Sequence, residues 1–154
     1  MDDTNTQNTF NLEPQGNTIT LTFTQIIEKD QSSKQARLVV SEIESIFNKN
    51  TSKNFGILID LTKLQNLPGF VTEESRQIYT EFSRNPQIYK IAVVGANLFY
   101  KIATNFLVTA SRRGSVIKWF SDLEEAKEWL KAEQSWYNMP TTAEVAQLAR
   151  AAAS

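Results

Sequence analysis

The side chains in this chain that could do chemistry are carboxylates, hydroxyls and lysines, because its 154 residues include no histidine and no cysteine. Catalysis by a Ser-His-Asp or Cys-His arrangement is therefore excluded, whereas Ser-Lys and carboxylate mechanisms stay open. A metal would have to be held by clustered carboxylates. The acidic pairs Glu73-Glu74 and Glu124-Glu125 each fall in the first turn of an expected helix, where the helix dipole favours carboxylates. We therefore expect no metal site and no cofactor.

Asp60 ends an apolar run and is the carboxylate best placed for chemistry. In response-regulator receivers, an aspartate at the carboxyl end of a central parallel strand accepts phosphate. That chemistry also needs an acidic pair after the first strand to hold Mg²⁺ and a lysine at the end of the last strand. Here an early strand ends in Thr22-Phe23-Thr24, and Lys118 lies inside the last strand. We expect Asp60 instead to hydrogen-bond amides of the loop that follows it.

A glycine follows another apolar run, in Gly95-Ala96-Asn97. A strand-glycine-helix turn exposes amide donors to an anion. The G-x-G-x-x-G spacing of dinucleotide sites is missing, however, and Asn97 is an ordinary N-cap residue. The sequence therefore leaves an anion site here as an alternative to a plain helix cap.

Length and charge limit the classes of function. A chain of this length is the size of one ordinary domain. Its 16 Lys+Arg and 17 Asp+Glu residues give a net charge of -1, so we expect no nucleic-acid partner. No run approaches the ~18 apolar residues of a membrane span, and the polar start lacks the features of a secretion signal. We expect a cytoplasmic protein with no integral membrane segment.

A β-hairpin is expected to begin the fold. Residues 9–12 and 18–24 flank Glu13-Pro14-Gln15-Gly16, a sequence typical of a turn. Apolar residues alternate with threonines along the second strand, which is the period of a half-buried strand. Residues 1–8 are too polar to bury a core, and we expect them to be disordered.

Strand-helix units follow the hairpin. Three apolar runs, at residues 55–60, 88–95 and 115–120, each lead into a segment of helical periodicity. This alternation predicts a single α/β domain over residues 9–133, with a mixed sheet of about five strands and about four helices. The hairpin supplies the antiparallel edge, and the three later strands are parallel.

Caps mark the ends of the expected helices. Ser32 with Gln35, and Ser121 with Glu124, fit capping boxes at two helix starts. Thr72 is a plausible N-cap for the helix between them. A helix that begins near Asn97 is expected to stop at Arg112-Arg113-Gly114, where cations precede a glycine.

The last part of the chain, residues 134–154, differs from the rest. It contains Trp136, Tyr137 and Met139 in a segment without clear periodicity, and an alanine-rich stretch that is marginal as an isolated helix. Large apolar side chains are costly to leave in water. We therefore expect this tail to dock either on the domain or on a partner.

Three phrases carry a family resemblance: ILIDLTKL (57–64), YKIAVVGANLFYKIATNFL (89–107) and VIKWFSDLEEAKEWL (116–130). Together they cover about half of the chain, and they resemble the SpoIIAA-like STAS domains, also described as STAS/SEC14-like. The resemblance implies a non-enzymatic regulatory module that binds a protein partner, as anti-sigma factor antagonists do. The SEC14 side of the comparison implies instead a carrier of an apolar ligand such as a lipid. Self-association is compatible with either function.

The antagonists carry an Asp-Ser pair at the start of the helix after the Asp-Leu strand, and phosphorylation of that serine breaks partner binding. The corresponding place, residues 69–75, has no such pair, so Thr72 or Ser75 would have to take the role. Like-charge repulsion from Glu73 and Glu74 would oppose a phosphate there, and Thr72 is equally interpreted as a plain cap. The partner-binding or regulatory candidates are Asp60, Thr62, Phe70, Thr72 and Ser75, and the ligand-pocket candidates are Asn97, Phe99, Tyr100 and Phe106.

Overall fold

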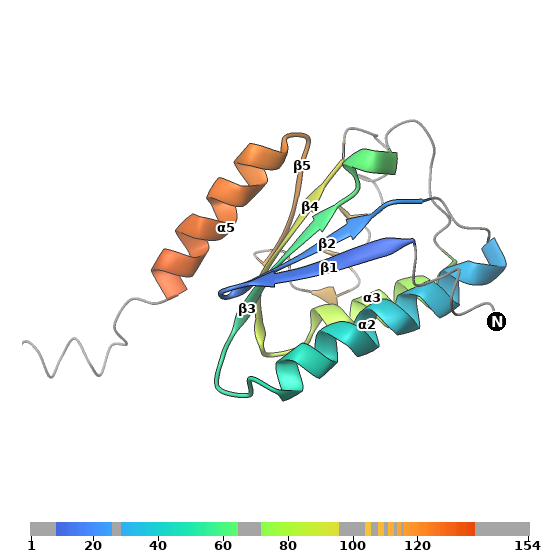
Figure 1. Cartoon of the computed structure of the whole chain (residues 1–154). Coiled ribbons are helices and arrows are strands. Elements are labelled where there is room, and N and C mark those ends of the chain that lie inside the picture. Colours follow the sequence, from blue (N-terminus) through green and yellow to red (C-terminus); the bar gives the residue numbers. More distant parts are fainter. Residues whose placement is uncertain are drawn as a thin grey trace, which may run out of the picture.

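The chain folds around one mixed β-sheet with helices on both faces (Figure 1). The computed structural model describes residues 9–25, 29–64, 72–95, 104–105, 108–109, 111–112, 114 and 116–137. Five strands lie side by side in the order β1-β2-β3-β4-β5. Because neighbours in the chain are also neighbours in the sheet, every strand pairs with the next one in sequence.

The hairpin joins β1 (Phe10–Gln15) to β2 (Thr18–Phe23) in antiparallel pairing. The predicted turn at Glu13-Pro14-Gln15-Gly16 is wrong, because β1 continues through Gln15. Gly16, with a φ of 61°, is the first residue of a two-residue connection, and such hairpin turns need a positive φ there. Pro14 is tolerated inside β1 because this is an edge strand and proline has no N–H to donate.

The strands β3 (Phe55–Asp60), β4 (Ile88–Val94) and β5 (Ile117–Phe120) are parallel, as the sequence predicts. The strand β2 is also parallel to β3, so the antiparallel pairing is confined to the hairpin. Helices α2 (Ser32–Asn48) and α3 (Glu73–Ser83) pack together on one face, and α5 (Leu123–Tyr137) covers the other (Figure 1).

The central strand β3 is buried on both faces, because its side chains alternate between two apolar clusters. Ile57 belongs to the larger cluster, on the side of α2 and α3, and Leu58 belongs to the smaller cluster beneath α5. The last apolar residue of the strand, Ile59, is only half-buried, whereas the sequence predicts full cover. The expected two-sided burial therefore holds for the body of the strand and weakens at its carboxyl end.

A glycine lets α5 lie close to the sheet. A Cβ atom added to Gly56 of β3 would lie 3.0 Å from the Tyr89 hydroxyl oxygen and 3.3 Å from a Leu130 methyl carbon. Tyr89 comes from β4, where the register with β3 shifts, and Leu130 comes from α5. Gly56 of β3 thus lies against both the irregular part of β4 and the helix α5.

Both predicted capping boxes are wrong. The helix α2 has Gln31 as its N-cap with no side-chain hydrogen bond, while Ser32 is buried inside the first turn. At the start of α5, the Asp122 carboxylate accepts the Glu124 N–H at 3.3 Å, so the cap lies one residue later than the Ser121 that the pattern predicts. Burial explains why Ser32 does not cap α2. A buried hydroxyl needs a hydrogen-bond partner, and that of Ser32 donates to Ser75.

The helix before β5 ends where the sequence predicts, but the residue with a positive φ is Arg112 and not Gly114. Arg112 takes a φ of 60°, and its N–H donates to the Val108 carbonyl at 3.1 Å, which ends the helix. Gly114 does not adopt a positive φ. The start of this helix near Asn97 lies outside the described residues.

The chain ends are described only in part. Residues 1–8 and 138–154 lie outside the described ranges, so the expected disorder and tail docking remain predictions. Backbone helix continues to Tyr137, although the sequence pattern predicts an irregular segment from residue 134. Among the described helices, none combines the length and the apolar character that a membrane crossing requires.

Candidate functional site

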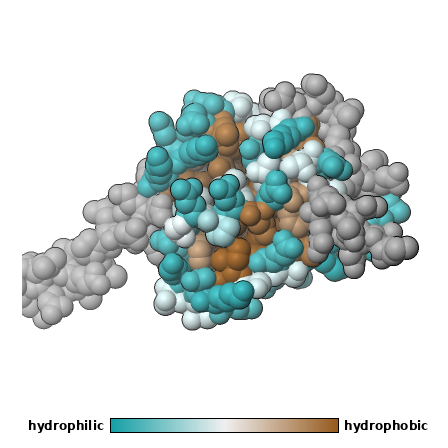
Figure 2. All heavy atoms as spheres, viewed as in Figure 1, coloured by the Kyte–Doolittle hydropathy of each residue, from teal (hydrophilic) through white to brown (hydrophobic). Residues whose placement is uncertain are grey.

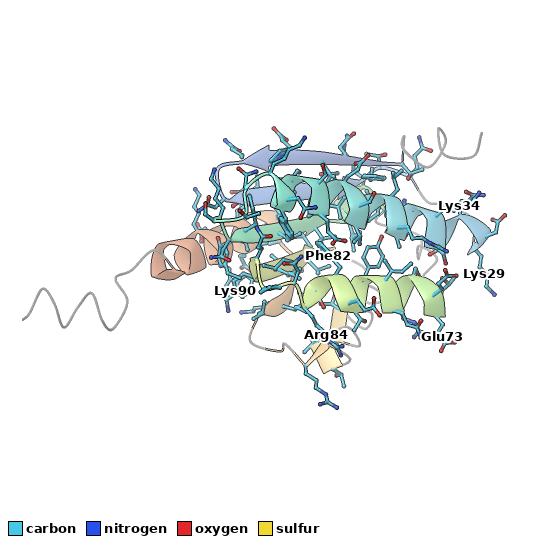
Figure 3. The ribbon with its side chains drawn as sticks, turned by 90° about the horizontal axis from the view of Figure 1, so that it is seen from below. Lys29, Lys34, Glu73, Phe82, Arg84 and Lys90 are labelled. Carbon is cyan, nitrogen blue, oxygen red and sulfur yellow. The ribbon has the colours of Figure 1, made fainter. Side chains whose placement is uncertain are left out.

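The candidate site lies at the carboxyl end of the parallel strands. Two helices start at this end of the sheet: α2 follows β2, and α3 follows β3. Seen from below, α2 and α3 lie side by side, with Lys29, Lys34 and Glu73 near the end where both helices begin (Figure 3). In open α/β sheets, sites are generally built at this edge from the loops after the strands.

Asp60 organises the loop that leaves β3. One of its carboxylate oxygens accepts hydrogen bonds from the Thr62 N–H at 2.9 Å and from the Thr62 hydroxyl at 2.6 Å. This closes the chain into a short 3-10 turn, Thr62–Leu64, and Leu64 is buried in the core. The expectation that Asp60 bonds a loop amide is confirmed, and Thr62 is its partner.

A group of four hydroxyl side chains, here called the hydroxyl cluster, joins the starts of α2 and α3; its members are Ser32, Ser33, Thr72 and Ser75. Thr72 caps α3 as predicted, because its hydroxyl oxygen accepts the Ser75 N–H at 3.1 Å. The Ser33 and Thr72 hydroxyls are 3.3 Å apart, and the Ser32 hydroxyl donates to that of Ser75 at 3.1 Å. The cluster therefore links residues 39 and 43 positions apart in the sequence.

Burial divides the cluster into two parts. Ser75 and Ser32 are 1% and 3% exposed, and the Ser75 hydroxyl also donates to the Thr72 carbonyl at 3.0 Å. Ser33 and Thr72 are half-buried and reach the surface. Of the two regulatory candidates at the start of α3, only Thr72 is thus presented to solvent, while Ser75 serves the helix junction.

Charged side chains surround the cluster. Arg37 of α2 makes an ion pair with Glu74 of α3, in which its second guanidinium nitrogen is 2.9 Å from the carboxylate. The two side chains are 55% and 58% exposed, so the pair adds little stability and remains accessible to a partner. On the other side of α2, the Gln35 amide donates to the hydroxyl of Thr9, the residue before β1, at 2.8 Å.

Two residues predicted from the sequence to form a capping box act instead as tertiary contacts. Ser32 and Gln35 follow the S-x-x-Q pattern, yet each bonds a residue from a distant segment. Ser33 was not singled out by the sequence at all. An unusual run of hydroxyl and amide residues at the start of an amphipathic helix was the available signal, but it does not reveal the partners.

The backbone N–H of Gly95 is not available to the anion site that the sequence leaves as an alternative. This residue is buried, and its N–H donates to the Phe120 carbonyl of β5 at 3.1 Å. The remaining candidates from the sequence, Phe70, Asn97, Phe99, Tyr100 and Phe106, lie outside the described residues. The ligand-pocket prediction therefore stays a prediction.

Tyr79 of α3 is a titratable residue with a structural role. Burial raises the pKa of the Tyr79 phenol above its ordinary value of 10, because a charged phenolate would lose its hydration. Tyr79 packs against the larger apolar cluster and stays protonated at neutral pH. Within the described residues, no three His, Cys, Asp or Glu side chains gather closely enough to hold a metal ion.

Comparison with known proteins identifies the fold family. The family model described as SpoIIAA-like matches residues 19–131, from the second residue of β2 to the ninth residue of α5. No curated protein matches the chain. The chain is similar to the crystal structure of an uncharacterized protein of the DUF3478 family with a SpoIIAA-like fold, from Shewanella loihica PV-4. That match has a TM-score of 0.52 at 16% sequence identity and covers 79% of this chain and 91% of the other. On the length of the family match, the chain belongs to the SpoIIAA-like family.

Proposed function

We propose that this chain is a non-catalytic regulatory module that binds a protein partner, in the manner of anti-sigma factor antagonists, through the surface around Thr72. One observation carries the proposal: the hydroxyl cluster locks the starts of α2 and α3 together and leaves Thr72 half-exposed among charged side chains. A rigid polar surface at the ends of two helices suits recognition, because little side-chain freedom is lost on binding.

The bonding of the hydroxyls favours binding over catalysis. The hydrogen bonds of Thr72 and Ser75 run to other hydroxyls and to backbone groups. A nucleophilic hydroxyl needs a base within hydrogen-bond reach, and within the described part of the chain neither of these two hydroxyls bonds to one. Their arrangement therefore supports a structural and recognition role.

The surroundings of Thr72 also favour a protein as the ligand. The exposed Arg37 and Glu74 present charges of opposite sign beside it, and Glu73 adds a further exposed carboxylate. Interfaces between proteins commonly have such a polar, solvent-accessible rim. A partner with complementary charges would gain orientation and association rate from these groups.

A capture experiment tests the proposal. The tagged protein is used to retain partners from an extract of its own cells, in parallel with Thr72→Glu and with Thr51→Glu as the matched control, since Thr51 is exposed in the turn after α2. We expect Thr72→Glu to reduce partner recovery by roughly tenfold and Thr51→Glu to leave it unchanged. The melting temperature should fall by only a few degrees, because an N-cap contributes about 1 kcal/mol.

Two results would count against the proposal. Equal recovery by the wild type and Thr72→Glu would remove the start of α3 from the interface. Recovery of a fatty or isoprenoid compound in place of a protein, with no effect of Thr72→Glu, would favour the apolar-ligand carrier instead.

A further inference from the structure

Among the described residues, only β2 pairs with β1, so the outer side of β1 forms an edge of the sheet. The Thr24 N–H donates to the Thr9 carbonyl at 2.8 Å, which marks these two residues as a hydrogen-bonded pair of the hairpin. Bonded and non-bonded pairs alternate in antiparallel strands. Asn11 and Glu13 therefore bond to β2, while the N–H and C=O groups of Phe10 and Leu12 point away from the sheet.

Apolar side chains flank this edge on the side of α2. Leu12 is half-buried and packs against the larger cluster, as do the half-buried Leu38 and Ile46 of α2. Figure 2, drawn from the side on which β1 faces the viewer, shows hydrophobic surface between β1 and α2. Glu42 lies between Leu38 and Ile46 in the helix and makes the strip partly polar.

The sequence of β1 is complementary to itself in one antiparallel register. If Leu12 of one copy lies opposite Leu12 of another, Asn11 lies opposite Glu13, and Phe10 lies opposite Pro14. Each Asn11 amide can then donate to the Glu13 carboxylate of the other copy, and no like charges face each other. The two Leu12 side chains then meet on the face of the larger cluster, against which Leu38 and Ile46 also pack.

The residues that usually protect an edge strand do not prevent this pairing. Pro14 lacks an N–H, but its carbonyl accepts from Phe10 of the other copy in this register. About four backbone hydrogen bonds form, two between the Leu12 residues and one at each flank. Glu13, a typical edge charge, is paired with an amide. A free peptide would gain only the short backbone ladder, whereas a second copy also covers the apolar strip on α2.

We propose that two copies of this chain associate through β1 in antiparallel pairing centred on Leu12, which extends the two sheets into one. The strip is small and partly polar, so the dimer forms reversibly and its population rises with protein concentration. Neither the SpoIIAA-like fold nor the binding surface around Thr72 requires this contact, which lies on a different edge of the molecule.

Introduced cysteines give a direct test, because the natural chain has none. In the proposed register, the Leu12 Cα atoms lie within the range that a disulfide spans. Under mild oxidation, Leu12→Cys should give roughly tenfold more covalent dimer than the exposed control Thr51→Cys. A mixture of Asn11→Cys and Glu13→Cys proteins should cross-link, and each of these variants alone should do so weakly. Melting curves verify that every variant is folded.

Sedimentation of the unmodified protein supplies the second measurement. We expect its average mass to rise from monomer toward dimer with concentration, and Leu12→Lys to weaken the association by at least roughly tenfold, since it brings two ammonium groups together at the axis. A wild type that stays monomeric at every concentration would overturn the proposal. So would cross-linking by Asn11→Cys alone that equals the yield from Leu12→Cys, because it would show a different register.

Discussion

Thr72 shows how one hydroxyl can serve both a helix and a surface. It accepts the Ser75 N–H as an N-cap and also lies 3.3 Å from the Ser33 hydroxyl of the neighbouring helix. The cap could be predicted, because threonine before two glutamates is a local signal. The contact with α2 could not, since it depends on how two helices separated by β3 pack against each other.

Gly56 lies where its surroundings leave little room for a side chain. Gly56→Ala would place a methyl carbon 3.0 Å from the Tyr89 hydroxyl and 3.3 Å from Leu130, so α5 or the β4 bulge would have to move. We expect a loss of about 1–3 kcal/mol in the free energy of unfolding, measured with urea. Adding Tyr89→Phe to Gly56→Ala should recover part of the loss, and an alanine variant as stable as the wild type would contradict this packing.

At the scale of elements, the sequence predicts the five strands and the helices α2, α3 and α5, but it misplaces the end of β1 and the N-caps of α2 and α5. The alternation in β2 and the apolar runs of β3 and β4 reflect burial, which acts on every residue of an element. Ends depend on one or two side chains. Pro14 resembles a turn residue yet lies inside β1 because the strand is at an edge, and Arg112 adopts the positive φ that the sequence pattern assigns to a glycine.

Gln87 connects three segments and gives a test at this scale. Its side-chain amide, just before β4, lies 3.3, 3.1 and 3.1 Å from the carbonyls of Phe47, Asn50 and Lys53, which end α2 and lead to β3. Gln87→Ala should lower the free energy of unfolding by about 1 kcal/mol, because these carbonyls lose a donor. The near-isosteric Gln87→Glu should cost more, since it turns a carboxylate toward the same oxygens. Thermal melts that rank glutamate above alanine in stability would refute this role.

For the whole molecule, the sequence predicted the sheet because burial on both faces leaves a continuous apolar run in a strand. The candidate site was only partly predictable. Asp60 and Thr72 were identified from local signals, whereas Ser32 and Ser33 became part of the site through the packing of α2 on α3. Residues that meet only in the folded chain leave no spacing in the sequence.

The burial of β3 on both faces predicts that an introduced aspartate destabilises the protein more in the middle of the strand than at its carboxyl end. Ile57 is fully buried, so Ile57→Asp would bury an unpaired charge and should prevent folding. Ile59 is half-buried at the carboxyl end of the same strand, so Ile59→Asp should yield a folded protein with a lower melting temperature. Soluble, cooperatively melting Ile57→Asp protein would show that the strand is placed wrongly.

Amide hydrogen exchange of the protein with and without its captured partner tests most directly the claim that the starts of α2 and α3 form the binding surface. The account predicts that the partner slows exchange at residues 33–37 and 72–76, while amides of α5 exchange at an unchanged rate. Slowed exchange confined to α5 and the sheet face beneath it, with no change at the start of α3, would contradict the claim.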